Sequence, residues 1–302
     1  ELIALAYDAA LAPEKWRVLM ARLIQAMGTR SAILRENDAD GQVGLFEAVG
    51  YEPAFVAAYR NHYVHLDHFA PILRSTPVGL VVTGDQAVPW ERQRHTEFFN
   101  DYVLAQKQRH VMGGILARDD RYDLLFAMQR EVGQPDFSKE DMRLIRLVVP
   151  HMTRAVKIHR RMAEVTAEKQ WAFSALDRLR VGVILLDERG RPLFVNRAAE
   201  RLASGRNGFV AGRDGLTLPA AADTARLRRL IADAAALATG RGAMGGGCLR
   251  TSGGSGAALQ FQVIPLPRGI SEQPLEQSLP GGCVAVFVSA GGGPRLSPER
   301  IA

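Results

Sequence analysis

Hydrophobic periodicity divides the first part of the chain into helical and strand-like segments. Residues 13–27 repeat apolar side chains at steps of three and four, and Pro13 suits the first turn of a helix. Alternating apolar and polar positions predict strands at 31–36 and 43–49, around a turn at 38–41, and at 110–119 and 123–131. The aromatic segments 51–65 and 90–103 predict helices. Helices around a short antiparallel sheet predict an α+β domain over residues 1–137.

A second periodic pattern begins at Ser138, which is followed three residues later by an acid, as at a capped helix start. Apolar residues then recur at alternating steps of four and three for five heptads, which predicts a helix over 138–178. Such a helix is about 60 Å long, which favours pairing of two copies along the stripe in a parallel dimer. The predicted dimer seam is Leu144, Val148, His151, Ala155, Ile158, Met162 and Val165.

Two features leave this seam open to another interpretation. The stripe can instead pack on its own domain, without a second copy. Pro150 predicts a kink, or a junction between two helices, near 146–150.

The remaining residues predict a second α+β domain over 179–290. Two short strands flank a turn at 187–190, and Asn196 then stands at the cap position of a helix. A helix over 223–239 and strands near 244–251, 257–266 and 282–288 complete an antiparallel meander, with a loop expected at 266–282. Residues 291–302 are expected to be a linker, and Ser297-Pro298 predicts the start of a helix that continues into a further domain.

Composition excludes several classes of protein. Hydrophobic residues make up 47% and charged residues 23% of the 302 positions, which is typical of a globular protein and not of a disordered one. No apolar run approaches the ~20 residues that cross a bilayer, and the first residues lack the basic start of a secretory leader. Two cysteines, Cys248 and Cys283, are too few for a disulfide framework. A cytoplasmic protein without a membrane partner is therefore expected.

The positive charge is concentrated in one segment. Residues 138–178 contain nine Lys or Arg against five acids, a net of +4 out of the chain's +6. A solvated basic face of a helix explains this excess more simply than a nucleic-acid contact does. The 302 residues contain no zinc finger, basic zipper or complete helix-turn-helix pattern.

Aromatic residues form the most promising candidate site. Phe55, Tyr59 and Tyr63 stand at i, i+4 and i+8, and Asp67 continues the series. A second aromatic set lies at 90–102. Aromatic walls with one acid suit a small, mostly apolar ligand, and a cavity of at least ~300 Å³ is then expected, whereas core packing would leave none. The predicted ligand-binding residues are Phe55, Tyr59, Tyr63, Asp67, Trp90, Phe99 and Tyr102.

Neither a metal, a cofactor nor a catalytic site is expected. On a helix, His62, His65 and His68 follow one another at steps of three and cannot converge on one ion. A pair of them with a distant histidine, His95 or His110, remains open. The second half has no Asn-Cys-Arg phrase for a flavin adduct and no histidine for haem. No G-x-S-x-G, P-loop or H-E-x-x-H motif is present, so the chain is not expected to be an enzyme.

The order of these segments resembles known sensor domains. The arrangement over 1–137 resembles a GAF domain, and the strand-turn-strand opening that ends at Asn196 resembles a PAS domain. Together with the phrase LVVPHMTRA at 147–155 and the helix start at 297–302, the chain is similar to the regulatory region of a LuxR-type transcriptional regulator. This resemblance implies a homodimer, a small-molecule effector, and DNA contact through a C-terminal helix-turn-helix domain beyond these residues.

A narrower resemblance concerns the aromatic series. The spacing of Phe55, Tyr59, Tyr63 and Asp67 resembles that of acyl-homoserine-lactone receptor domains, in which the acid accepts a hydrogen bond from the ligand amide. Phe stands here in the usual Trp place, the acid arrives one residue early, and His68 replaces the usual Pro. These departures imply a ligand other than the lactone. A module that only dimerises or binds a protein is the alternative.

Overall fold

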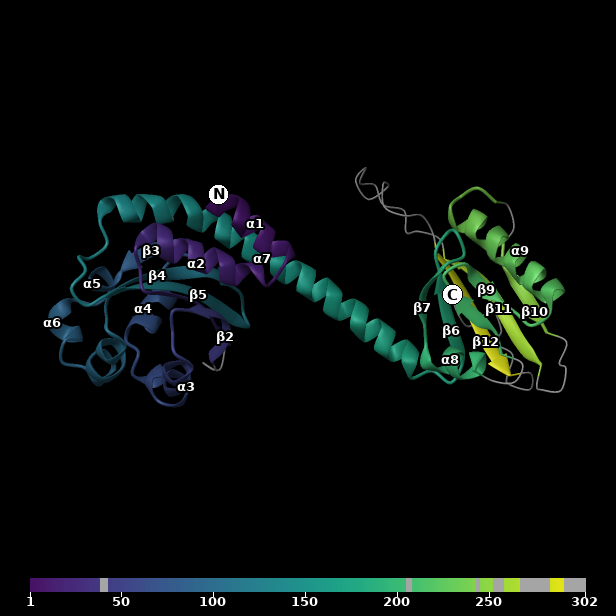
Figure 1. Ribbon diagram of the computed structural model, residues 1–302, viewed down its shortest axis with the longest axis horizontal. Helices are drawn as coiled ribbons and strands as arrows, with labels where there is room; N and C mark the ends of the chain where they lie inside the picture. Colours follow the sequence, from purple (N-terminus) through teal and green to yellow (C-terminus); the bar gives the residue numbers. More distant parts are fainter. Residues whose placement is uncertain (39–42, 205–207, 243–244, 252–257, 267–282, 291–302) are drawn as a thin grey trace. The chain divides into compact units, whose positions relative to one another are not determined.

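The computed structural model describes residues 1–38, 43–204, 208–242, 245–251, 258–266 and 283–290 (Figure 1). The chain forms two compact units, Glu1–Thr166 and Ala167–Ala302. Each contains a five-stranded antiparallel sheet with helices, so the predicted α+β class is confirmed. The predicted loop at 266–282, the helix start at 297–302 and most of the turn at 38–41 lie outside the described residues.

The sheet of the first unit has the strand order β2-β1-β5-β4-β3. Four of the strands were predicted from alternation, and the three-residue β3 was not. Their bounds are β1 Ser31–Asp38, β2 Val43–Val49, β3 Val81–Thr83, β4 Gln108–Arg118 and β5 Tyr122–Glu131.

The two-residue period of β1 and β5 gives this sheet two different faces. Even-numbered residues such as Leu34 and Phe126 are fully buried in an apolar core. Odd-numbered residues such as Ile33, Arg35 and Ala127 point to the opposite side and line a cavity there.

Three helices cover the apolar face (Figure 1): α1 Leu2–Leu11, α2 Lys15–Met27 and α7 Lys139–Asp177. The stripe predicted for α2 is confirmed, because Trp16, Leu19 and Leu23 are at most 1% exposed. Helix α7 begins with the predicted cap, in which the Asp141 N–H donates to Ser138 Oγ at 3.1 Å. It continues through Pro150 as one helix, so the predicted junction is not found.

The structure corrects the predicted dimer seam in its first half. Val148 and Ala155 are buried in the core of the first unit, and Leu144 packs against that core. His151 pairs with the Tyr7 hydroxyl at 3.0 Å. These positions face α1 and the sheet because α7 closes the core of its own unit. The seam residues Ile158, Met162 and Val165 are exposed.

The other face of the sheet carries short helical segments where two longer helices were predicted. The predicted helix over 51–65 breaks at His62, whose φ of −138° is not helical. The one over 90–103 divides into α6 and a π-helical segment, η2. The segments are α3 Pro53–Asn61, η1 Tyr63–His65, α4 Phe69–Ser75, α5 Gly84–Ala87, α6 Trp90–Gln93, η2 Phe98–Val103 and η3 Leu104–Gln106.

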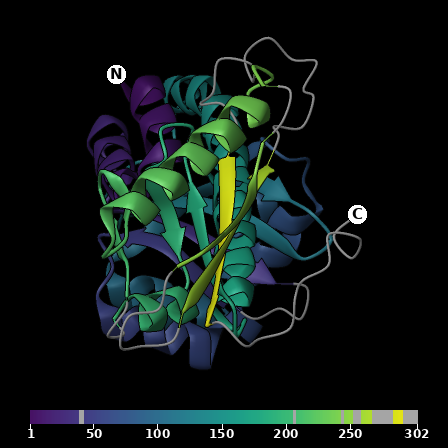
Figure 2. The same cartoon turned by 90° about the vertical axis from the view of Figure 1, so that its right-hand side faces the viewer.

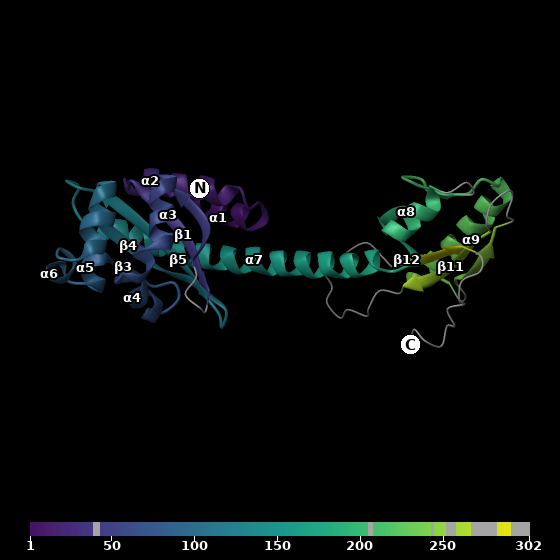
Figure 3. The same ribbon diagram turned by 90° about the horizontal axis from the view of Figure 1, so that it is seen from below.

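The second unit has the strand order β10-β11-β12-β6-β7, and α9 crosses its sheet (Figure 2). Helices α8 and α9 lie beside β11 and β12 (Figure 3) and share one apolar core with them. The five predicted strands are all present, and a small hairpin of β8 and β9 is added. The bounds are β6 Gly182–Leu186, β7 Pro192–Val195, α8 Arg197–Ala203, β8 Val210–Gly212, β9 Gly215–Thr217, α9 Ala221–Ala238, β10 Gly247–Arg250, β11 Leu259–Leu266 and β12 Cys283–Ala290.

Asn196 connects three segments of the second unit, and its predicted role as a helix cap is confirmed. Its Oδ1 accepts from the backbone N–H of Ala199 at 2.9 Å and of Val183 at 2.8 Å. Its Nδ2 donates to the carbonyl oxygens of Leu176 at 2.8 Å and Val181 at 3.0 Å. One fully buried amide thus holds the end of α7 to β6 and α8.

Among the described residues, no helix combines the length and the apolar character that crossing a membrane requires.

Candidate functional site

A cavity of about 100 Å³ lies in the first unit, between the sheet and the layer of short helices. Its floor comes from the odd-numbered residues of β1 and β5, because a strand sends alternate side chains to one face. Its roof comes from α3, α4 and η2. The lining includes Ile33, Arg35, Tyr51, Val56, Tyr59, Asp67, Phe69, Phe98, Phe99, Tyr102, Gln108, Leu125, Ala127 and Gln129.

A buried charged cluster lies at one side of this cavity. The Tyr59 hydroxyl donates to Asp67 Oδ2 at 2.6 Å. Arg35 Nη1 donates to the Tyr59 hydroxyl and lies 3.5 Å from Asp67 Oδ2. The Arg35 and Asp67 side chains are only 6% and 8% exposed, so this is an ion pair inside the protein and not on its surface.

Asp67 is held in place by backbone as well as by side chains. Its Oδ1 accepts from the backbone N–H of Phe69 at 2.9 Å and of Ala70 at 3.1 Å, at the start of α4. The other carboxylate oxygen is therefore fixed toward Tyr59 and Arg35. This arrangement explains why an acid at the end of the aromatic series points inward.

The Arg35 guanidinium has a further buried donor besides Nη1. Its Nε is buried and has no hydrogen-bond partner in the described part of the chain. An unpaired buried donor costs about 1–3 kcal/mol. A ligand carbonyl or hydroxyl oxygen that accepts from this N–H would remove the cost.

A second polar group extends along the floor of the cavity. The Ser31 hydroxyl donates to Gln129 Oε1 at 2.8 Å, and Gln108 Nε2 donates to Ser31 Oγ at 3.0 Å. All three side chains are buried. The cavity thus has aromatic walls with amide and hydroxyl groups at fixed positions, as small-molecule sites commonly do.

The phenols around the cavity stay protonated. Burial is the main cause that raises the pKa of Tyr102, to about 12. Burial, followed by the negative charge of Asp67, raises the pKa of Tyr59 well above its ordinary value. Both hydroxyls are therefore protonated at neutral pH and can act as donors.

The structure brings four of the seven predicted ligand-binding residues to the cavity: Tyr59, Asp67, Phe99 and Tyr102. The other three do not line it. Phe55 and Tyr63 pack against Tyr102 at ring distances of 6.2 and 4.8 Å, and Trp90 stacks under the Arg109 guanidinium at 3.7 Å. They are part of the aromatic packing that supports the roof.

The sequence interpretation missed Arg35, which forms the ion pair with Asp67. Its signal was a charged residue at an inward position of a strand, between Ile33 and Asn37 on the same face. The cavity is also smaller than the ~300 Å³ that was expected of a ligand site.

Comparisons with known proteins show distant structural similarity only. No protein-family model matches the chain, and no curated protein matches it in sequence. The ligand-binding domain of VqsR from Pseudomonas aeruginosa is 18% identical over 53% of this chain and 94% of that one, with a TM-score of 0.46. The N-acylhomoserine lactone dependent LuxR-family factor CepR2 from Burkholderia cenocepacia is 14% identical over 54% and 96%, with a TM-score of 0.38.

A third structure spans most of the chain. The DhaR(N)–DhaL complex of E. coli matches 95% of this chain and 86% of that one, at 14% identity and a TM-score of 0.37. The chain is thus distantly similar to ligand-binding domains of LuxR regulators and to sensor domains. These similarities concern the fold alone.

Proposed function

We propose that the first unit is a sensor domain that binds a small, mostly apolar molecule carrying one carbonyl or amide group. The observation that carries this proposal is the buried pair of Arg35 and Asp67 at the wall of an aromatic cavity. The buried Arg35 Nε, which has no hydrogen-bond partner among the described residues, also supports it. A ligand carbonyl would accept from Arg35, and a ligand amide would donate to Asp67 Oδ2 in place of the Tyr59 hydroxyl.

The size of the cavity restricts this ligand. A cavity of about 150 Å³ in another protein holds benzene, whereas the cavity here is about 100 Å³. A ligand larger than a few atoms therefore displaces the roof formed by α3, α4 and η2. A ligand shifts the roof only if it binds more tightly to one position of the roof than to the other. Asp67 stands at the start of α4, so a ligand that contacts Asp67 would couple its binding to the position of α4.

We further propose that the full protein is a LuxR-type transcriptional regulator and acts as a homodimer. The order of the segments and their short phrases support this, and the DNA contact would be made by a C-terminal helix-turn-helix domain. The exposed part of the α7 stripe, Ile158, Met162 and Val165, would form the dimer contact, since these side chains are 40%, 45% and 48% exposed.

A second candidate function is an interaction module without a ligand. The small cavity volume favours it, because tight aromatic packing would by itself stabilise the roof. The two candidates differ in whether a small molecule stabilises the first unit.

Thermal unfolding with benzamide, acetophenone and ethylbenzene tests the proposal. At 100 times its dissociation constant a bound compound adds ~2.7 kcal/mol to the stability. Benzamide and acetophenone are expected to stabilise the protein more than ethylbenzene, and Asp67→Asn is expected to reduce the benzamide effect while Asp101→Asn, an exposed control, leaves it unchanged. Equal or absent effects of all three compounds would favour the interaction module.

A further inference from the structure

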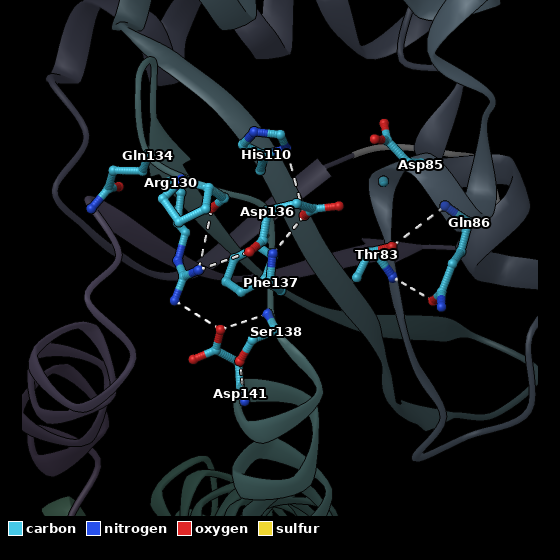
Figure 4. Close-up of polar contacts among 12 residues, drawn as sticks. Thr83, Asp85, Gln86, His110, Arg130, Gln134, Asp136, Phe137, Ser138 and Asp141 are labelled. Atoms are coloured by element: carbon cyan, nitrogen blue, oxygen red, sulfur yellow. Dashed lines mark hydrogen bonds and ion pairs between the residues drawn. The ribbon is translucent and has the colours of Figure 1, made fainter.

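A cluster of three metal-ligating side chains lies at the edge of the first unit, outside the Arg35–Asp67 pair. Asp85 comes from α5, His110 from β4, and Asp136 from the loop before α7 (Figure 4). One ligand atom of each lies within 4.8 Å of one ligand atom of both others. The three residues are far apart in the sequence, so no local motif could have shown the cluster.

The separation of two of these ligand atoms suits a tetrahedral ion. His110 Nδ1 and Asp136 Oδ1 are 3.5 Å apart. Two ligands at zinc-like bond lengths of about 2.0–2.2 Å and a tetrahedral angle are separated by roughly 3.4 Å. Asp85 is exposed, so its carboxylate has room to turn toward the same point.

The charge of the cluster also points to a cation. In the described part of the chain, no Lys or Arg forms an ion pair with Asp85 or Asp136, and His110 is the basic side chain within ion-pair distance of the Asp136 carboxylate. Arg130 is nearby, but it donates to the backbone carbonyl oxygens of Pro135 and Asp136. Two carboxylates thus meet one imidazole without a basic partner within ion-pair distance. Lys139 and Arg143 line the adjoining groove.

Neighbouring groups orient the ligands. Gln93 Nε2 donates to Asp85 Oδ1 at 3.3 Å, and the buried Gln93 also donates to the Gly84 carbonyl. The Phe137 backbone N–H donates to Asp136 Oδ1 at 2.7 Å. Thr83 and Gln86 form a capping box that fixes the start of α5, as Figure 4 shows. Such outer partners are typical of residues that hold a metal.

We propose that Asp85, His110 and Asp136 bind one divalent cation of the zinc type. An imidazole with two carboxylates favours Zn²⁺ or Co²⁺ over Mg²⁺ and Ca²⁺, which prefer oxygen ligands only. Three protein ligands leave a fourth position for water. This site goes beyond the sensor function proposed above and does not depend on it.

The position of the site gives it a structural consequence. Asp136 lies two residues before Ser138, the cap of α7. His110 also lines the aromatic cavity. A bound ion would therefore tie the start of α7 to β4 and α5, and it would stiffen the wall of the cavity.

Cobalt titration of the untagged protein tests this proposal. We expect one equivalent of Co²⁺ to give the visible absorption of a tetrahedral site and Zn²⁺ to displace it. His110→Ala, Asp85→Asn and Asp136→Asn should each weaken the binding by roughly tenfold or more. The matched controls His95→Ala and Asp101→Asn change exposed residues of the same unit and should bind like the wild type.

Three outcomes would overturn the proposal: no saturable binding at one equivalent, wild-type affinity in Asp85→Asn and Asp136→Asn, or an equal loss in the controls. Circular dichroism of each variant shows whether it is folded. If His110→Ala unfolds, Asp85→Asn still decides, because Asp85 is exposed and an Asn side chain keeps an oxygen that can accept from Gln93.

Discussion

The Tyr59 hydroxyl donates to Asp67 Oδ2 at 2.6 Å, and Arg35 reaches both groups from the neighbouring strand. These contacts join α3 and the start of α4 to β1. The roof of the cavity is therefore held to its floor by an ion pair and the hydrogen bonds of Tyr59. The strength of this link decides how easily the cavity opens.

Asp67→Ala is expected to lower the free energy of unfolding by about 3–5 kcal/mol, since it leaves Arg35 buried without its counter-charge. Urea unfolding measures the loss. Asp101→Ala, an exposed control, should change the stability by no more than about 0.5 kcal/mol. A loss below about 1 kcal/mol for Asp67→Ala would show that Arg35 is solvated and that the ion pair is not buried.

The double variant Arg35→Met with Asp67→Leu separates charge from packing. Apolar replacements of a buried ion pair are often neutral or stabilising. We expect the double variant to be more stable than Asp67→Ala but unable to respond to benzamide. If benzamide still stabilises the double variant, the ligand binds away from Arg35 and Asp67.

Ala127→Leu is expected to fill the cavity from its floor, because Ala127 lines it from β5 and is 5% exposed. Overpacking should cost about 1–3 kcal/mol, and stabilisation by benzamide should disappear. Ala57→Leu, on the exposed side of α3, is the control. Retained stabilisation by benzamide in Ala127→Leu would contradict the assigned cavity.

The lowered pKa of His159 predicts that the free energy of unfolding decreases in mild acid. Burial is the main cause that lowers the pKa of His159, although its hydrogen bond to the Ala10 backbone opposes the shift. As the pH falls through about 6.5, the unfolded chain takes up a proton that the folded chain refuses, so stability decreases until the lower folded pKa is reached.

Urea unfolding between pH 7.5 and pH 5 measures this slope. His159→Gln should have a shallower slope than the wild type, because the titrating ring is gone. His110, whose pKa burial also lowers, contributes in the same direction and keeps part of the slope in the variant. Identical slopes would show that His159 protonates as readily in the folded chain as in the unfolded one.

Asn196→Ala is expected to destabilise the second unit by about 2–4 kcal/mol. It removes a helix cap and the amide that pairs with the Val183 N–H and the Val181 carbonyl oxygen, whereas the Leu176 carbonyl oxygen still accepts from the Leu179 N–H at 3.2 Å. Asn100→Ala, in which the lost amide is exposed, is the control. Urea unfolding followed by hydrogen exchange at β6 and α8 locates the loss, and protection equal to the wild type there would contradict the role of Asn196.

The exposed face of α7 predicts a concentration-dependent dimer. Replacing Ile158, Met162 and Val165 together with Ser should abolish the dimer in sedimentation equilibrium. These apolar side chains are 40%, 45% and 48% exposed in the single chain, and the second copy would cover them. Leu147→Ser removes a 66% exposed side chain outside the seam and should leave the dimer intact. A wild-type monomer at high concentration would reject the dimer.

Regular elements were predictable wherever one face of an element is buried. The alternation of β1 and β5 and the stripe of α2 follow from burial against a single core, so the pattern in the sequence and the contacts in space agree. The seam of α7 was assigned to the wrong partner in its first half. The apolar repeat indicates that Val148 and Ala155 are buried, but it does not indicate which part of the protein covers them.

The site was harder to predict because its parts come from distant segments. Tyr59 and Asp67 were found through local spacing, although His62 breaks the helix on which that spacing was based. Arg35 joins them only through the pairing of β1 in the sheet. Asp85, His110 and Asp136 also converge through tertiary structure alone.

The alternation along β1 and β5 separates residues that face the cavity from residues that form the apolar core. If the first unit binds a ligand as proposed, mutations at Ser31, Arg35 or Gln129 would alter the polar groups at the cavity without changing the apolar packing on the other face of the sheet. Mutations at Leu34 or Phe126 would instead change the apolar core and hence the stability. Under the proposed sensor function, a lineage of such proteins would acquire new effectors through substitutions at odd-numbered positions, with the even-numbered ones held constant.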